Sequence, residues 1–150
     1  MKIALCSDEL YPINDFVAGE LVLRNHQVVL FGALKSRKEE PWPKVAEEAA
    51  QSIIRGDCRE GIFFCFTGTG IAMAANKVAG IRAALCGDAE TARLARVWNH
   101  ANVLALSNRL TTNDLAKEIL DAWFAAGCDP RGNKEVQLLS AIENRTRQQS

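Results

Sequence analysis

The fold is decided by residues 61–77, whose sequence is GIFFCFTGTGIAMAANK. The apolar run at residues 61–64 is typical of a buried strand, and the glycine-rich turn at residues 65–70 leads into a segment that resembles a helix. A strand that enters a helix through such a turn directs backbone N–H groups, and the positive end of the helix, at whatever lies in the turn. The stretch therefore predicts a strand, an anion-binding loop and a helix.

Cys65 lies at the mouth of this predicted loop. The positive end of a helix favours the thiolate form of a nearby cysteine, which makes Cys65 a candidate base or nucleophile. The alternative is a buried cysteine at the end of a strand, without a chemical role. Neither common nucleotide-binding loop is expected, because Met73 stands where the dinucleotide fingerprint needs its third glycine and no GxxxxGK[ST] run occurs.

Short apolar runs alternate with helical patterns along the chain. Strands are predicted at residues 2–7, 27–31, 61–66, 81–86 and 102–106. Helices are predicted at residues 13–25, 44–55, 71–77, 88–98 and 113–126. The longest predicted loop, residues 34–43, is polar and contains Pro41 and Pro43. Repeated βα units of this kind predict an α/β fold with a doubly wound parallel sheet, in a single domain that spans residues 1–150.

A final polar helix is predicted at about residues 134–147, where Val136, Leu139 and Ile142 form an apolar line. A five-stranded sheet with its other helices in place leaves little room for this segment. We therefore expect the helix to pack at a subunit interface, which makes a homo-oligomer the predicted assembly.

The composition excludes several classes of partner. The formal net charge is zero, from 18 Lys and Arg residues and 18 Asp and Glu residues, so neither nucleic acid nor a membrane surface is expected to bind. No apolar run is long enough to cross a bilayer. The five cysteines have no CxxC spacing and the two histidines are not clustered, so we expect no metal site and no disulfide framework, and a cytoplasmic location. Packing or surface positions are assigned to Cys6, Cys58, Cys86 and Cys128.

Ligands of a doubly wound sheet bind at the carboxyl ends of its strands. The first strand leads into Asp8 and Glu9, the third into the loop of Cys65, and the fifth into Arg109. Asp8 either orients a sugar hydroxyl group or makes a structural hydrogen bond at a helix start or in a loop. The carboxyl edge of the sheet is therefore the predicted site.

Three blocks of the sequence carry a resemblance: residues 65–77, AGIRAA at residues 79–84 and NVLALSNR at residues 102–109. They are similar to the type B ribose-5-phosphate isomerases and the related galactose-6-phosphate isomerase subunits, and the resemblance covers nearly the whole chain. It implies a Rossmann-like three-layer α/β/α sandwich with a five-stranded parallel sheet, in a homodimer or tetramer with sites between subunits. It also implies aldose–ketose interconversion of a sugar or sugar phosphate through an enediolate, without a metal or organic cofactor.

The resemblance assigns roles to the residues of the glycine-rich loop. Cys65 is the base that takes the C–H proton of the sugar. The N–H groups around Gly68, Thr69 and Gly70 form the anion hole that holds the negative oxygen. Thr67 assists proton transfer, or else caps the helix that follows.

Three more site residues are carried over from the same resemblance. Asn99 matches an asparagine near the sugar, Arg109 matches an arginine of the phosphate site, and Arg131 matches the first of two further arginines. Taken alone, both arginines are equally consistent with surface charges, so their assignment depends on the family match.

Four positions at or beside the expected pocket depart from the family pattern. Histidines are replaced by Glu9 and Trp98, the second C-terminal arginine by Glu135, and the glycine after the catalytic cysteine by Phe66. A phosphate with a charge near −2 would be repelled by each new carboxylate, by about 1 kcal/mol per contact at a partly wet site. The substitutions therefore predict a substrate other than ribose 5-phosphate.

That substrate is either a different sugar phosphate bound in another register or a sugar without this phosphate. In the second case, its hydroxyl groups would donate hydrogen bonds to Glu9 and Glu135. Because the ring-opening histidine is missing, a substrate that is already open-chain, or that opens unaided, is a further alternative. His100 either acts as an acid or base from a shifted loop or points elsewhere. Trp98 is either a stacking face for a sugar ring or part of an interface.

A function of a different class is also open. The chain is then a non-catalytic or partner-dependent subunit, or a sugar-binding protein, on the same fold. The retained Cys65, Thr67, Gly68 and Gly70 argue against this reading, because a chain without catalysis has no need of a thiol at an anion hole. A flavodoxin-like nucleotide or flavin binder follows from the fold alone.

Overall fold

The computed structural model describes residues 1–149. Its elements, in chain order, are β1 (Lys2–Ser7), α1 (Pro12–Leu23), β2 (Gln27–Gly32), α2 (Ala33–Ser36), α3 (Trp42–Ile54), β3 (Glu60–Cys65), α4 (Thr69–Ala75), β4 (Ala83–Leu85), α5 (Ala89–Asn99), β5 (Val103–Ser107), α6 (Asn113–Ala125), the 3-10 turn η1 (Pro130–Gly132) and α7 (Asn133–Gln148). The strands form a five-stranded sheet in the order β2-β1-β3-β5-β4, and each neighbouring pair is parallel. The predicted α/β fold with a five-stranded parallel sheet is confirmed.

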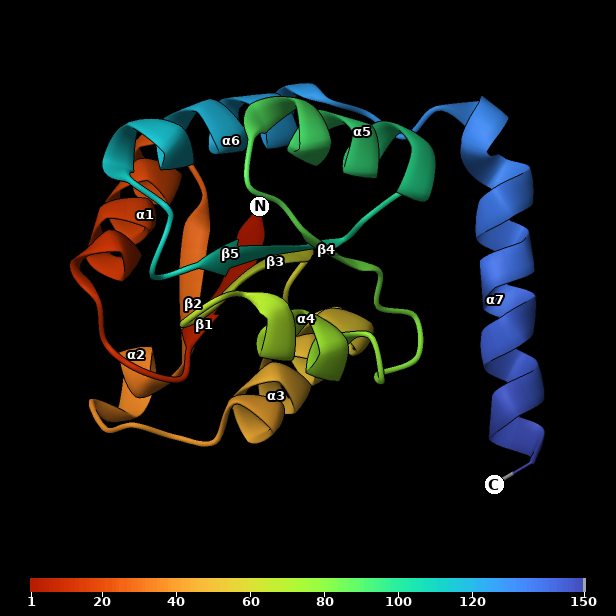
Figure 1. The fold of residues 1–150 in the computed structure, drawn as a ribbon, viewed down its shortest axis with the longest axis horizontal. Helices are drawn as coiled ribbons and strands as arrows, with labels where there is room; N and C mark the ends of the chain where they lie inside the picture. Colours follow the sequence, from red (N-terminus) through yellow and green to blue (C-terminus); the bar gives the residue numbers. More distant parts are fainter. Residues whose placement is uncertain (150) are drawn as a thin grey trace.

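Helices cover both faces of the sheet (Figure 1). Helices α1, α5 and α6 lie on one face, α3 and α4 lie on the other, and the short α2 directly follows β2. Strand β3 shows how the sequence produces these layers, because its side chains alternate between the faces. Phe64 packs into the core under α1, α5 and α6, whereas Phe63 packs into the core under α3 and α4. Both rings are fully buried, as expected for a strand at the centre of a parallel sheet.

The connections of the sheet reverse direction at the carboxyl ends of β1 and β3. These strands are neighbours, but β1 continues through α1 to β2 on one side, and β3 continues through α4 toward β4 on the other. Ser7 is paired with Phe64, and Cys65 is paired with Ser107 of β5. A reversal of connections between neighbouring strands is where doubly wound sheets bind ligands.

Several predicted boundaries were wrong. The predicted loop at residues 34–43 contains α2, and α3 begins at Trp42 because Pro43 suits the first turn of a helix. Strand β3 ends at Cys65 rather than at residue 66. Strand β4 covers only Ala83–Leu85 instead of residues 81–86, because the N–H of Arg82 is bonded to the side chain of Asn102 rather than to a strand.

The side chain of Asn76 covers the backbone of the edge strand β4. Its Nδ2 donates to the carbonyl oxygen of Ala83 at 2.9 Å, and its Oδ1 accepts the N–H of Ala83 at 2.8 Å. The amide thus makes the same two hydrogen bonds that a neighbouring strand would make at this position.

A buried ion pair connects the other end of β3 to α5 and α6. The carboxylate of Glu60 accepts hydrogen bonds from Arg96 at 2.7 Å and from the indole of Trp123 at 2.9 Å. Arg96 also donates to the carbonyl oxygen of Ala101 at 2.6 Å and lies 4.8 Å above the Trp123 ring. These contacts hold the C-terminal end of α5 against the core.

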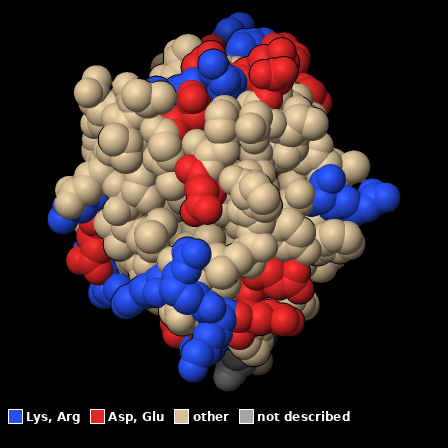
Figure 2. All heavy atoms as spheres, turned by 90° about the vertical axis from the view of Figure 1, so that its left-hand side faces the viewer, with Lys and Arg blue, Asp and Glu red and all other residues tan. Residues whose placement is uncertain are grey.

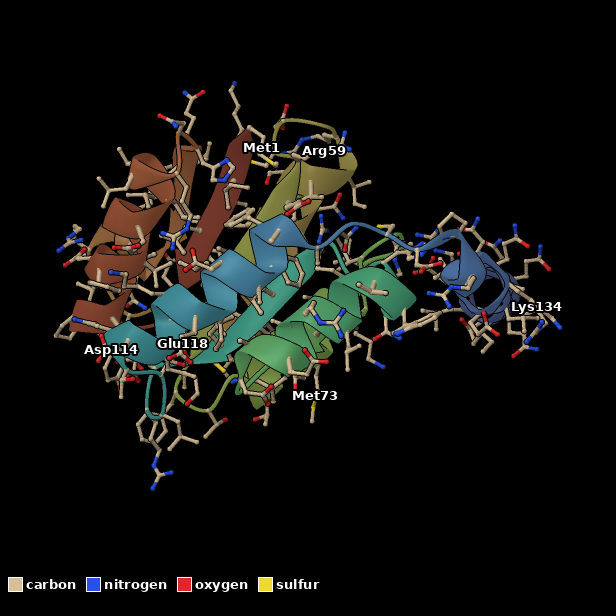
Figure 3. All side chains as sticks on the ribbon, turned by 90° about the horizontal axis from the view of Figure 1, so that it is seen from above. Met1, Arg59, Met73, Asp114, Glu118 and Lys134 are labelled. Atoms are coloured by element: carbon tan, nitrogen blue, oxygen red, sulfur yellow. The ribbon has the colours of Figure 1, made fainter. Side chains whose placement is uncertain are left out.

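Helix α7 stands apart from the α/β body, as Figure 3 shows from above. None of its described residues is buried, and Leu138, Leu139 and Ile142 are about half exposed. A hydrogen-bonded contact joins it to the body: the N–H of Gly80 donates to both carboxylate oxygens of Glu143 at 3.1 and 3.2 Å. Within residues 1–149 there is no helix with the length and apolar character needed to cross a membrane.

Candidate functional site

Cys65 is the last residue of β3, at the carboxyl edge of the sheet. The side chain is almost fully buried, and its sulfur accepts a hydrogen bond from the N–H of Gly68 at 3.2 Å. Asp8 follows Ser7 and therefore lies beside Cys65, because Ser7 and Phe64 are paired in the sheet. The structure thus brings a thiol and a carboxylate together at the predicted edge.

The loop after Cys65 depends on a glycine at residue 68. Gly68 has φ +79°, and a Cβ added there would lie 2.5 Å from a methyl of Leu85 and 3.0 Å from the backbone of Leu106. Both its backbone conformation and its surroundings exclude a side chain. Thr67 does not cap the following helix; its hydroxyl lies 2.7 Å from that of Thr69 instead.

A buried amide network that the sequence analysis missed joins the end of β1, the start of α1 and the loop after β5. Asn14 donates from its side chain to Asn108 Oδ1 at 2.8 Å, and Asn108 donates to Ser7 Oγ at 3.1 Å. Ser7 in turn donates to the backbone carbonyl of Glu9 at 2.5 Å. The signal in the sequence was a polar Asn14 on the apolar side of its helix, next to Ile13, where a buried amide must find partners.

Asp8 has a partly unsatisfied carboxylate. Its Oδ1 atom is buried and has no hydrogen-bond partner among residues 1–149. Burial raises the pKa of Asp8 above its ordinary value, and the charges of Glu9 and Glu39 raise it further. Such a group is typical of a site where a ligand supplies the missing donor.

We expect Asp8→Asn to raise the melting temperature at pH 7 by about 2 °C. A carboxyl whose native pKa lies above its unfolded value contributes stability that is fully present below the unfolded pKa and is lost as the pH rises through the native pKa. The ionised Asp8 therefore costs stability at pH 7, and solvent screening of this half-buried group keeps the difference small.

Thermal unfolding at pH 7 and at about pH 3.5 measures the effect, because at the lower pH most carboxyl groups are close to half protonated or more. The gain should be smaller at the lower pH. Asp15→Asn, at an exposed position in the first turn of α1, is the control and should show no gain. A melting temperature of Asp8→Asn at or below that of the native protein at pH 7 would contradict the prediction.

Glu9, Phe66 and Arg109 lie in the loops that follow β1, β3 and β5, at the same edge of the sheet. Glu9 is half-buried, Phe66 is half exposed, and Arg109 is exposed at the end of the loop after β5. The backbone N–H of Arg109 donates to the carbonyl of Phe66 at 3.0 Å, so the two loops are joined. Figure 2 shows this side of the molecule: most of it is uncharged, an acidic cluster lies near its middle, and basic side chains lie toward its rim.

The remaining predicted site residues lie at the opposite edge of the sheet. Trp98, Asn99 and His100 form the C-terminal end of α5, directly before β5, and Arg131 and Glu135 belong to η1 and α7. The five residues of β5 separate this group from the carboxyl edge, a distance of about 16 Å at the rise of a parallel strand. Within one chain, the predicted site is therefore divided into two groups. The Cys65 group lies at the carboxyl edge and consists of Asp8, Glu9, Cys65, Thr67, Gly68, Thr69, Gly70 and Arg109. The Trp98 group lies at the opposite edge and consists of Trp98, Asn99, His100, Arg131 and Glu135.

Arg131 is already paired within its own chain. Its guanidinium forms an ion pair with Asp129 at 2.7 Å and lies 4.9 Å above the ring of Trp98. The hydrogen bonds from Arg131 lower the pKa of Asp129 to about 2. His100 is held in the same cluster, because its Nε2 lies 2.9 Å from the carbonyl oxygen of Asp129.

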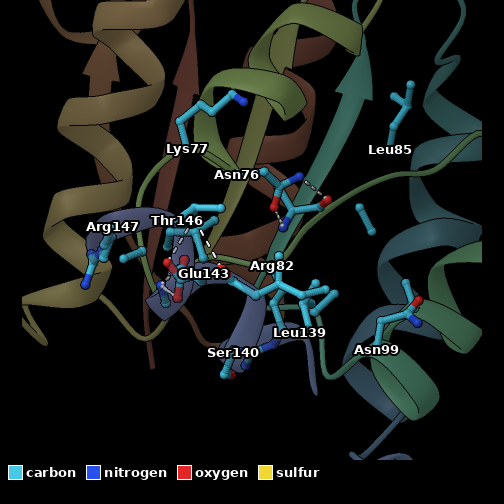
Figure 4. Close-up of a pocket in the computed structure, with 18 of the residues that line it drawn as sticks. Asn76, Lys77, Arg82, Leu85, Asn99, Leu139, Ser140, Glu143, Thr146 and Arg147 are labelled. Atoms are coloured by element: carbon cyan, nitrogen blue, oxygen red, sulfur yellow. Dashed lines mark hydrogen bonds between the residues drawn. The ribbon is translucent and has the colours of Figure 1, made fainter. Parts of the chain in front are cut away.

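A groove of about 830 Å³ separates α7 from the edge strand β4. Figure 4 shows Arg82, Leu139 and Glu143 along it, with Asn99 at one end. Of the predicted site residues, its lining includes Asn99 but not Cys65, so the groove does not contain the proposed base. No cluster of three or more His, Cys, Asp or Glu side chains suited to a metal ion occurs in the described residues 1–149.

Comparison with known proteins gives consistent matches over this fold. A family model described as ribose/galactose isomerase matches residues 3–140. Ribose-5-phosphate isomerase B of Escherichia coli is 37% identical over 146 residues, which cover 96% of this chain and 97% of that protein. The D-erythrulose-4-phosphate isomerase of Pectobacterium atrosepticum is 40% identical over 109 residues, 72% of each chain. The structure of ribose-5-phosphate isomerase B from Clostridium thermocellum is similar with a TM-score of 0.89 at 36% identity, covering 97% of this chain and 99% of that one.

Proposed function

The chain belongs to the ribose/galactose isomerase family of sugar-phosphate isomerases, and from this premise we propose that it interconverts an aldose and a ketose with Cys65 as the base. The observation that carries the proposal is the sulfur of Cys65, which accepts the N–H of Gly68 at 3.2 Å at the end of β3. A hydrogen bond donated to the sulfur stabilises the thiolate, and the thiolate is the form that accepts a proton.

In the proposed reaction, Cys65 takes the proton from C2 of an open-chain aldose. The electrons of the C–H bond form the C1–C2 double bond of an enediolate, and the carbonyl oxygen becomes negative. The N–H groups in the first turn of α4 lack partners within the helix and hold this oxygen. Thr67, whose hydroxyl is 2.7 Å from that of Thr69, moves a proton between the two oxygens, and return of the carbon-bound proton to C1 gives the ketose.

We infer that a second copy of the chain completes the site. The Cys65 group and the Trp98 group lie at opposite edges of one sheet, so one chain does not place them around the same sugar. A two-fold dimer brings the Cys65 group of each protomer to the Trp98 group of its partner. The exposed apolar residues Leu138, Leu139 and Ile142 support a dimer interface that includes α7. Because the site residues are divided between two edges, a second candidate function is a subunit that forms its site only together with a different but related chain.

We propose that the substrate is not ribose 5-phosphate. Glu9 and Glu135 place carboxylates where the family resemblance implies contacts near a phosphate, and Arg131 is already neutralised by Asp129. Within residues 1–149, neither glutamate forms an ion pair with a lysine or an arginine. A dianionic phosphate at this position would be repelled by about 1 kcal/mol per carboxylate at a solvent-exposed site.

The test is exchange of the C2 proton in deuterated water, followed by NMR, with tetroses to hexoses offered with and without a terminal phosphate. We expect exchange with at least one sugar other than ribose 5-phosphate. Cys65→Ala and Asn99→Ala should each lose most of this exchange. When the two inactive variants are mixed so that subunits redistribute, about one quarter of the sites combine two intact groups, and exchange should return to about one quarter of the native rate.

The matched control mixes Cys65→Ala with Thr67→Ala, because both changes lie in the same group and no redistribution restores an intact site. Equal recovery in the two mixtures would contradict a site shared between subunits. Exchange that never appears with any sugar would contradict the isomerase proposal and leave the second candidate, for which a related chain must be added.

A further inference from the structure

Tyr11 holds the carboxylate of Glu9 in a fixed position. The Tyr11 hydroxyl donates to Glu9 Oε2 at 2.7 Å. Three other contacts fix the tyrosine itself. Its N–H donates to Asn14 Oδ1 at 2.9 Å, its carbonyl accepts the N–H of Asn14 at 3.0 Å, and its ring lies 6.4 Å from the ring of Phe66 at 31°. The hydroxyl is therefore a positioned donor rather than a mobile surface group.

This pair lies in the loop between β1 and α1, at the carboxyl edge of the sheet. Glu9 comes two residues after the end of β1, where its backbone carbonyl is held by Ser7, and Phe66 directly follows Cys65. Because Tyr11 contacts both Glu9 and Phe66, it joins the carboxylate to the loop that carries the proposed base. A sugar with its reacting carbon at the sulfur would extend its remaining carbons past these side chains.

The neighbouring charges on the β1 side of Glu9 are acidic and disfavour an anion there, whereas Arg109 is exposed on the loop after β5. Asp8 and Glu39 are the neighbouring charges that act on Tyr11 together with Glu9, and all three are acidic. The second carboxylate oxygen of Glu9, Oε1, has no hydrogen-bond donor among residues 1–149. A carboxylate with a free oxygen accepts a hydrogen bond from a hydroxyl group and repels a phosphate.

We propose that Tyr11 is a positioning residue that fixes Glu9 as a hydrogen-bond acceptor for a substrate hydroxyl group. The substrate carbon next to Glu9 then carries a hydroxyl group and no phosphate. The inference rests on the proposed isomerase function and names the part of the substrate that meets this side of the site. A phosphate, where the substrate has one, is bound away from β1. Glu9 and Tyr11 together then determine which sugars are accepted.

The experiment measures kcat and KM for sugars offered in pairs, with and without the terminal phosphate, on the native protein and on Glu9→Gln and Tyr11→Phe. Glu9→Gln keeps the shape and removes the charge. It should raise kcat/KM for phosphorylated relative to unphosphorylated sugars by about tenfold. Tyr11→Phe keeps the ring against Phe66 and removes the hydroxyl. It should raise KM for the best sugar by about tenfold, with kcat changed less than about twofold.

Asp57→Asn is the matched control, because it removes an exposed carboxylate on the loop before β3, at the opposite edge of the sheet, and the selectivity ratio should stay within about twofold. A purely structural role of Glu9 would lower kcat/KM for both members of each pair equally, and that result would overturn the inference. An unchanged KM in Tyr11→Phe would overturn it as well. Both outcomes leave the isomerase proposal intact, whereas a native protein that exchanges no C2 proton overturns both.

Discussion

Replacing Cys65 with alanine is expected to lower the rate of C2 proton exchange by about 1,000-fold, because a positioned general base contributes rate factors of this size. The change removes the group that takes the proton and leaves the backbone of the loop in place. Since the Cys65 side chain is small and lies at the end of β3, the fold should be retained. Exchange into deuterated water, followed by NMR on the best sugar, measures the loss directly.

Two further variants make this result specific. Cys128→Ala changes an exposed cysteine before η1 and should keep the native rate. Cys65→Ser keeps the shape but offers a hydroxyl that loses its proton far less readily than a thiol, so it should resemble the alanine variant. Exchange in Cys65→Ala within about tenfold of the native rate would assign the base to another group, and Asp8 beside it would be the first to replace.

Glu60→Ala is expected to lower the free energy of unfolding by about 3 to 5 kcal/mol, because it leaves the buried charge of Arg96 without its partner. Glu60 is almost fully buried, and its carboxylate also accepts the indole N–H of Trp123. In a chain of 150 residues a loss of this size lowers the melting temperature by about 10 °C or more. Denaturant titration and thermal unfolding give the two values independently.

The comparison with a surface ion pair separates burial from charge pairing. Arg55 and Asp57 are 2.9 Å apart with both side chains largely exposed, and Asp57→Ala should change the free energy of unfolding by less than about 1 kcal/mol. Glu60→Gln retains an acceptor for Trp123, so its loss in free energy of unfolding should lie between those of Glu60→Ala and Asp57→Ala. A loss below about 1 kcal/mol in Glu60→Ala would mean that Arg96 finds another partner or reaches water.

The order of strands and helices was predictable because it depends on local patterns. Residues 61–64 are apolar on both faces, which is the pattern of a central parallel strand, and the glycine turn after Cys65 marks where that strand ends. The short α2 and the three-residue β4 were not predictable in the same way. Their extents are set by tertiary partners, such as the Asn102 side chain that takes the N–H of Arg82.

The structure places the predicted site residues at two edges of the sheet, and only the first grouping follows from the strand pattern. Asp8, Glu9 and Cys65 share one edge because parallel strands end together, and this geometry follows from the strand pattern. Trp98 and Arg131 were assigned to the same site by resemblance, but the chain path places them at the other edge. Sequence patterns do not state whether residues of one site come from one chain or two. Tyr11 was missed because its role arises only when the ring meets Phe66 and the hydroxyl meets Glu9.

The amide of Asn76 also determines how this sheet ends. An uncovered edge strand is a template on which a strand of another molecule can be added, and repeated addition leads to fibrils. At Ala83 both backbone groups are already occupied by the Asn76 side chain, and β4 has only three residues. A foreign strand would have to displace a complete pair of hydrogen bonds before forming its own. Copies of this chain can therefore associate through side chains without their sheets growing into one another at this edge.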